Sequence, residues 1–161
     1  VTRAIALARE AGTPVILNPA PFQPVPDALL PQLFLLTPNA TECALLSGVP
    51  VTDVASARRA AEVLHCKGVT ALIITLGTQG ALLSLDGETT LIPACRATPV
   101  DTTGAGDAFN GALAARLAAG ATLTQAAQFA SAYASVCVER PGAAASMPEY
   151  AEALARQQAC A

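Results

Sequence analysis

The sequence predicts an α/β fold in which a mostly parallel, doubly wound sheet carries helices on both faces. Three observations support this prediction: short buried apolar runs, helical segments that alternate with those runs, and Gly or Pro at the junctions. Alternation of this kind is typical of a parallel sheet that is covered on both sides. The 161 residues are 53% hydrophobic and 13% charged, which fits one ordinary folded domain and argues against intrinsic disorder.

The first part of the chain alternates helical and apolar segments. The predicted elements are, in order, a helix over 2–11, strands over 14–17 and 33–36, and helices over 39–47 and 53–66. Glycine should end each helix, at Gly12, Gly48 and Gly68, and Asp53 has the position of an N-cap.

The second part begins with a β-branched apolar run and ends in alanine-rich helices. We expect a strand over 70–76, a hairpin of strands 81–85 and 89–93, and helices over 108–119, 123–138 and from about 148 onwards. Asp86-Gly87 between the paired strands is a hairpin signal. The sequence shows no internal repeat and no linker, so a single domain is predicted.

Composition excludes several classes of function. The net charge of -3 leaves no broad basic face for a nucleic-acid backbone, and no run reaches the roughly 20 apolar residues that span a membrane. The five cysteines are scattered, odd in number and without CxxC spacing, which favours free thiols in a reducing cytoplasm. His65 is the only histidine, so structural zinc is disfavoured.

The stretch DTTGAGDAFNG, residues 101–111, carries the strongest chemical signal. Gly104, Ala105 and Gly106 would present unobstructed main-chain amides at the start of a helix, where the helix dipole favours an anion. The Asp107 carboxylate lies beside them in the first turn. Such a pair suits phosphoryl transfer to an alcohol, because the amides bear developing charge and the carboxylate accepts the hydroxyl proton. The alternative is that Asp107 caps the helix and the glycines form a turn.

Four segments together resemble the ribokinase-like (PfkB-type) carbohydrate kinases. They are NPAP over 18–21, TPNATE over 37–42, ITLGTQG over 74–80 and DTTGAGDAFNGAL over 101–113. They occur in the family's order, and the resemblance covers essentially the whole chain. Within the family, the combination of NPAP with DTTGAGD is most similar to the ribokinase subfamily.

The resemblance implies a role for each matching position. Asp107 would be the catalytic base that contacts the sugar, with Gly104, Ala105 and Gly106 as the anion hole. Asn39 and Glu42 would place Mg²⁺ through its waters, which that ion retains readily. ATP would be bound by Asn39, Thr75, Leu76, Gly77, Thr78, Gln79, Gly80, Gly106, Asp107 and Ser131.

Three of these assignments have simpler alternatives. Asn39 and Glu42 fit a capping box equally well. Residues 75–80 could be only a connection from a strand to a turn, and Ser131 could be an ordinary helical serine.

A monovalent cation such as K⁺ is also implied by the resemblance. The matching positions are Asp101, Thr103, Cys137, Arg140, Gly142 and Ser146, several of them through backbone carbonyl groups. Such a cation would hold the loop of Asp101 against the loop of Gly142. The alternative is that Asp101 caps a turn.

The implied reaction is ATP-dependent phosphorylation of a sugar primary hydroxyl, with D-ribose to D-ribose 5-phosphate as the leading case. Kinases of this family are about twice as long, so residues 1–161 would be the C-terminal nucleotide-binding and catalytic portion, without the N-terminal sugar contacts and β lid. We expect the isolated chain to be inactive and the full-length form to be a homodimer. The alternatives are a kinase for another sugar or nucleoside, or a non-catalytic nucleotide-binding remnant.

Overall fold

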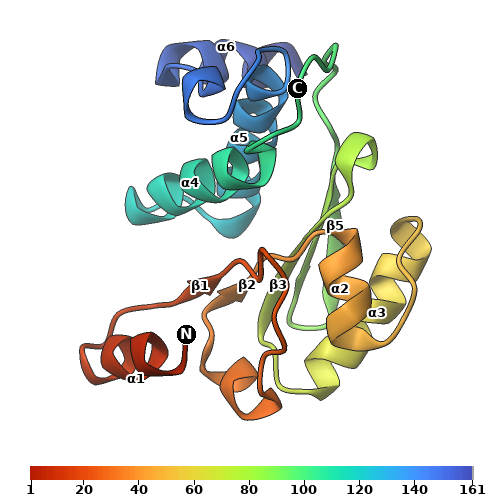
Figure 1. Ribbon diagram of the computed structural model, residues 1–161, viewed down its shortest axis with the longest axis vertical. Helices are drawn as coiled ribbons and strands as arrows, with labels where there is room; N and C mark the ends of the chain where they lie inside the picture. The colour runs from red at the N-terminus through yellow and green to blue at the C-terminus, as the bar shows by residue number, and fades with distance from the viewer. Residues whose placement is uncertain (161) are drawn as a thin grey trace. The chain divides into compact units, whose positions relative to one another are not determined.

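The computed structural model describes residues 1–160, which form two compact units (Figure 1). The first unit contains Val1–Leu76 and Leu82–Leu91, and the second contains Gly77–Ala81 and the chain from Ile92 onwards. Each unit contributes a different set of candidate site residues.

Five strands form one sheet in the order β1-β2-β3-β4-β5. Their bounds are β1 Ile16–Leu17, β2 Leu35–Leu36, β3 Ala71–Thr75, β4 Ala81–Leu85 and β5 Glu88–Ile92. The first three strands run parallel, with Ile16 opposite Leu35 and Leu36 opposite Leu72. The predicted hairpin is confirmed: Asp86 and Gly87 both have positive φ, 52° and 80°, as the tight turn between β4 and β5 requires.

The strands of the parallel part are buried on both faces. Side chains alternate along a strand, so Leu36 and Leu72 share one face, while Leu35 and Ile73 share the other. All four are 0% exposed. This burial explains why the strands appear in the sequence as continuous apolar runs rather than alternating ones.

Helices α2 and α3 pack side by side on one side of the sheet (Figure 1). The helical elements of the first unit are α1 Thr2–Glu10, η1 Asp27–Gln32, α2 Ala40–Ser47 and α3 Val54–Cys66. The predicted termini are confirmed, because the Asp53 carboxylate accepts from the Ser56 N–H at 2.7 Å and Gly48 ends α2 with φ 77°. Capping residues and alanine-rich packing therefore account for helix boundaries that match the sequence prediction.

The second unit is mainly helical. It contains η2 Gly77–Gln79, α4 Ala105–Ala118, α5 Leu123–Cys137, η3 Ala144–Ser146 and α6 Tyr150–Cys160. Buried alanines on α5, among them Ala126 and Ala130, let α4 approach closely. The Arg116 guanidinium carbon lies 5.5 Å from the centroid of the Phe129 ring on α5. The centroids of the Phe129 and Tyr150 rings are 5.2 Å apart. These contacts join α4, α5 and α6.

Some boundaries differ from the prediction. Helix α4 begins at Ala105, three residues earlier than expected, because Gly104 adopts φ 77° and serves as its N-cap. Strands β1 and β2 keep only two residues each, and the short 3-10 helices have no periodic signal that a sequence could show. Every helix within residues 1–160 is too short or too polar to cross a membrane.

Candidate functional site

Three of the motifs lie together at the carboxyl ends of β1, β2 and β3. Asn18 follows β1, and its side-chain amide donates to the Thr37 carbonyl oxygen at 2.8 Å. Thr37 follows β2, and its N–H donates to the Leu17 carbonyl oxygen at 2.9 Å. At β3, the Thr75 N–H donates to the Pro38 carbonyl oxygen at 3.0 Å. The carboxyl edge of parallel strands is where open α/β sheets bind their ligands.

Asn39 and Glu42 begin α2 as a reciprocal capping box. The Glu42 N–H donates to Asn39 Oδ1 at 2.9 Å, and the Asn39 N–H donates to Glu42 Oε2 at 2.8 Å. Glu42 is buried, with 6% exposed. The capping alternative is therefore present in the structure, and it leaves lone pairs on both side-chain oxygens for waters around a Mg²⁺ ion. Carboxylate and amide oxygens of this kind suit coordination of Mg²⁺ through its waters.

The glycine loop after β3 depends on Gly80. Its N–H donates to the Gly77 carbonyl oxygen at 3.0 Å, and its φ is 95°. A Cβ at Gly80 would lie 2.1 Å from the Ile92 carbonyl oxygen and 2.9 Å from the Ala94 nitrogen. Only glycine allows this approach, so the loop is packed main chain against main chain. Of the candidate residues, Thr75 and Leu76 belong to the first unit, and Gly77, Thr78, Gln79 and Gly80 to the second.

The glycine-containing loop of residues 101–106, the predicted anion hole, leads directly into α4. The Gly104 carbonyl oxygen accepts from the Ala108 N–H at 2.8 Å, which starts the helix. One prediction is corrected here: the Ala105 amide is not unpaired, because it donates to the Thr102 carbonyl oxygen at 3.2 Å. The Ala105 amide is used by the hydrogen bond that closes the turn of residues 102–105. The Gly104 and Gly106 amides therefore remain the candidates for an anion hole.

Asp107 lies in the first turn of α4 and is exposed to solvent. A carboxylate at this place is favoured by the helix dipole, whatever else it does. Its exposure leaves it accessible to an incoming hydroxyl group. The neighbouring Asn110 amide donates to the Gly106 carbonyl oxygen at 2.9 Å, which supports the first turn from the side.

Asp101 joins the loop of residues 101–106 to the loop after α5. One carboxylate oxygen accepts from the Thr103 N–H at 2.9 Å, and the other accepts from the Gly142 N–H at 2.9 Å. Hydrogen bonds from the Thr103 side chain, the Thr103 N–H and the Gly142 N–H, in that order of effect, lower the pKa of Asp101 to about 2. At Gly104, an added Cβ would lie 3.2 Å from the Ala143 Cα atom, so the two loops also touch.

Two buried side chains, those of Ser146 and Cys137, stabilise the loop after α5. Ser146 Oγ donates to the Ala143 carbonyl oxygen at 2.6 Å and lies 2.9 Å from the Cys137 sulfur. Both side chains are 0% exposed. The predicted monovalent-cation residues Asp101, Thr103, Cys137, Gly142 and Ser146 are thus brought together.

Arg140, the sixth residue of that predicted set, directs its side chain elsewhere. Its guanidinium pairs with Glu152 at 2.5 Å. Its backbone carbonyl still belongs to the same loop. A set of carbonyl and hydroxyl oxygens fits a hard cation, so the residues present are compatible with K⁺.

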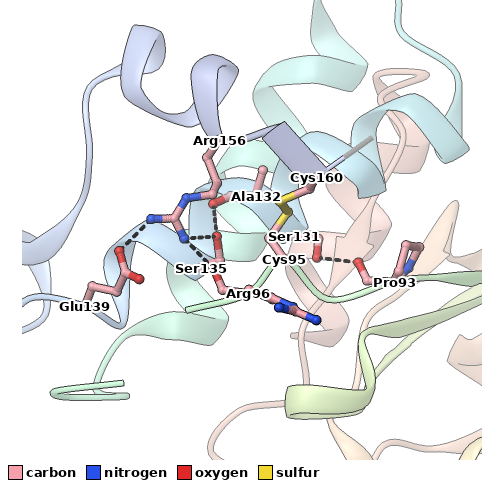
Figure 2. The surroundings of a disulfide bond; sticks show 9 residues. All are labelled: Pro93, Cys95, Arg96, Ser131, Ala132, Ser135, Glu139, Arg156 and Cys160. Atoms are coloured by element: carbon pink, nitrogen blue, oxygen red, sulfur yellow. Dashed lines mark hydrogen bonds and ion pairs between the residues drawn. A yellow bond between two sulfur atoms is a disulfide. The ribbon is translucent and has the colours of Figure 1, made fainter. Parts of the chain in front are cut away.

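Ser131 is engaged with the main chain. Its hydroxyl donates to the Pro93 carbonyl oxygen at 3.2 Å, in the segment between β5 and α4 (Figure 2). Ser131 therefore has a structural role that is independent of any ligand.

Two cysteines contradict the prediction that all five are free. Cys95 and Cys160 form a disulfide, with their Cα atoms 5.6 Å apart (Figure 2). They are separated by 65 residues, so no local spacing could reveal the pair. Cys43, Cys66 and Cys137 are free. Burial raises the pKa of Cys43 to about 12, which leaves Cys66 as the exposed free thiol among the described residues.

Comparisons with known proteins show the family to which the chain is related. The model of the pfkB family of carbohydrate kinases matches residues 1–150. A ribokinase of Haemophilus influenzae is 40% identical over 154 residues, which are 96% of this chain and 50% of that protein.

Solved structures give the same result. The Arabidopsis thaliana ribokinase complexed with ribose and ATP superposes with a TM-score of 0.89 at 34% identity, covering 96% of this chain and 50% of that one. A ribokinase of Thermotoga maritima has a TM-score of 0.85 at 34% identity, covering 96% and 52%. The fold is therefore ribokinase-like, and the chain spans about half the length of these relatives. Because the family model matches most of its length, the chain belongs to the pfkB family of carbohydrate kinases.

Proposed function

We propose that this chain is the C-terminal nucleotide-binding and catalytic portion of an ATP-dependent sugar kinase. The leading reaction is transfer of the ATP γ-phosphoryl group to the primary hydroxyl of D-ribose, which gives D-ribose 5-phosphate and ADP. The observation that carries the proposal is the exposed Asp107 carboxylate in the first turn of α4, directly after the glycine N-cap and the loop anchored by Asp101. Similarity to a ribokinase that binds ribose and ATP supports the choice of substrates.

Asp107 would act as the general base. Its carboxylate accepts the proton of the sugar hydroxyl as the oxygen attacks the phosphoryl group, and the Gly104 and Gly106 amides donate to the phosphoryl oxygens as charge develops on them. Asp101 keeps that loop in place through its bonds to Thr103 and Gly142. The reaction is mainly positioning and charge stabilisation, which is what such a loop can provide.

The remaining site residues would hold the nucleotide and its cations. Gly77–Gly80 would let main chain approach the phosphates and ribose. Asn39 and Glu42 would hold waters of a Mg²⁺ ion, which when bound neutralises charge on the phosphates. The carbonyl oxygens of the two loops joined by Asp101 would bind K⁺.

In its full-length form we propose a cytoplasmic homodimer with a sugar site and lid outside this chain. On this view the isolated chain has negligible turnover, because exclusion of water by a lid favours transfer over hydrolysis.

Asp107→Asn in the full-length protein tests the base. We expect kcat for ribose phosphorylation to fall by about 10²-fold to 10⁴-fold, while the ATP dissociation constant from calorimetry stays nearly unchanged. Asp86→Asn is the matched control, since Asp86 is a turn residue of the β4–β5 hairpin and Asn tolerates its positive φ. Wild-type turnover in Asp107→Asn would overturn the assignment of the base.

The second candidate function is a nucleotide-binding module without catalysis. The main-chain packing of the glycine loop at Gly80 fits it, because such a loop can bind a nucleotide without any catalytic side chain. ATP binding by a full-length protein that phosphorylates neither ribose, another sugar nor a nucleoside would support this second function.

A further inference from the structure

The segment between β5 and α4 is attached to helices α5 and α6 at three points (Figure 2). Pro93 accepts from the Ser131 hydroxyl at 3.2 Å. Cys95 is joined covalently to Cys160, near the end of α6. The Arg96 carbonyl oxygen accepts from the Arg156 guanidinium at 2.8 Å. Helices α5 and α6 therefore both hold this segment, called here segment 93–96.

Arg156 makes this attachment firm because it also binds α5. Its guanidinium pairs with Glu139 at 2.6 Å and donates to the Ser135 hydroxyl at 3.3 Å (Figure 2). The hydrogen bond from Arg156, followed by that from the Thr98 N–H, lowers the pKa of Glu139 below its usual range. Neither side chain of the ion pair is fully exposed, at 23% and 30%, so solvent screens it only in part. Segment 93–96 is therefore held by one covalent bond, the disulfide, together with the polar contacts of Arg156.

The other end of this attachment reaches the glycine loop after β3. Gly80 has no room for a Cβ because the Ile92 carbonyl oxygen and the Ala94 nitrogen lie against it. Segment 93–96 is thus continuous with the main chain that supports Gly77–Gly80. A displacement of Cys95 passes to that loop through rigid main-chain contact rather than through flexible side chains.

The disulfide is also within reach of a reductant. Cys160 is exposed and Cys95 is half-buried. In reducing compartments such bonds are usually transient and serve catalysis or redox sensing. A dithiol would attack one sulfur as a thiolate to form a mixed disulfide, releasing the other cysteine as a thiolate that takes up a proton. The second thiol of the reductant then displaces the remaining cysteine, so the reductant becomes a disulfide and the protein gains two thiols.

We propose that the Cys95–Cys160 disulfide is a reversible redox lock on the loop Gly77–Gly80, and that dithiol reduction lowers the affinity for ATP. The inference rests on the proposed function, which assigns that loop to the nucleotide. Reduction removes the covalent hold on Cys95 and leaves segment 93–96 with hydrogen bonds that can open locally. The loop beside Gly80 then spends more time away from the arrangement that binds ATP, and part of the binding free energy is used to restore it.

The test compares oxidised and dithiothreitol-reduced forms of the full-length protein. Mass spectrometry of the peptides with Cys95 and Cys160 verifies each state by the mass of two hydrogen atoms, and calorimetry measures the dissociation constant for ATP. We expect that constant to rise about fivefold or more on reduction. Cys160→Ser should have the weakened affinity in both states. Cys66→Ser, which removes an exposed free thiol, should respond to reduction as the wild type does.

The outcomes separate the two proposals. ATP binding that is equally tight in both states would overturn the lock and leave the proposed function intact. Failure to bind ATP in either state would refute the proposed function, and the lock with it. If Cys95 and Cys160 remain thiols after treatment with a disulfide oxidant, the lock is also refuted. Hydrogen exchange adds an independent readout: residues 77–80 and 92–96 should exchange faster on reduction, and unchanged exchange there would contradict the mechanism.

Discussion

Replacing Gly80 with alanine would place a methyl group against main chain of the second unit. The added methyl group would lie 2.1 Å from the Ile92 carbonyl oxygen, and the residue would have to keep φ 95°. The positive φ costs roughly 1–2 kcal/mol for a residue with a Cβ. The overlap with backbone adds about 1–3 kcal/mol, because no flexible side chain can move aside. The free energy of unfolding should therefore fall by about 2–5 kcal/mol.

Two other glycines of the second unit separate these contributions. Gly120 has φ 86° and no atom within 4 Å of an added Cβ, so Gly120→Ala should cost only the roughly 1–2 kcal/mol of the backbone angle. Gly111 lies inside α4 without a positive φ and with the same open space, so Gly111→Ala should stabilise by about 0.5–1 kcal/mol.

Urea unfolding followed by circular dichroism would measure the three changes against the wild type. The expected order of stability is Gly111→Ala, wild type, Gly120→Ala, Gly80→Ala. A Gly80→Ala protein that is no less stable than Gly120→Ala would refute the inference that main chain fills the space beside Gly80, and with it the route by which segment 93–96 supports the loop.

Two further predictions concern helix caps. The hydrogen bonds from Ser56 lower the pKa of Asp53 in the folded state, so its stabilising effect should be present above its unfolded pKa of about 3.9 and be lost as pH falls below that value. Asn can cap the helix but does not titrate. The urea midpoints of the wild type and of Asp53→Asn should therefore converge as the pH is lowered, and a difference between the two midpoints that stays constant to low pH would contradict this. Asn39→Ala should lower the free energy of unfolding by about 1 kcal/mol, and Asn39→Ser should change it little, because Ser also caps a helix. Both substitutions should weaken Mg²⁺-dependent ATP binding. If the Mg²⁺ dependence is unaltered in both variants, Asn39 acts only as a helix cap.

Much of the fold was predictable because its signals are local. Asp53, Gly48 and the Asp86-Gly87 pair act within a few residues of themselves, and the structure places them as caps and a turn. The start of α4 was missed because glycine is a permissive N-cap with no side-chain bond to signal it. The two-residue strands β1 and β2 are shorter than the apolar runs that contain them, since burial extends beyond the paired residues.

The site was predictable as a set of motifs but not as a set of contacts. The composition of residues 101–107 predicts an anion-binding loop, whereas the hydrogen bond from the Gly142 N–H to Asp101 joins residues 41 positions apart. The buried contact between Cys137 and Ser146 depends on how α5 ends, and the pairing of Cys95 with Cys160 depends on where α6 packs. Tertiary packing decides such contacts, and no spacing rule encodes them.

The two hydrogen bonds that the Asp101 carboxylate accepts, from Thr103 and from Gly142, also have a thermodynamic consequence. A flexible glycine-rich loop normally becomes ordered when its ligand arrives, and the conformational entropy lost at that moment weakens binding. Here the carboxylate has already fixed the loop in the folded protein. If the loop binds an anion as proposed, that anion would meet a preorganised surface, and less of its contact free energy would be spent on ordering the loop.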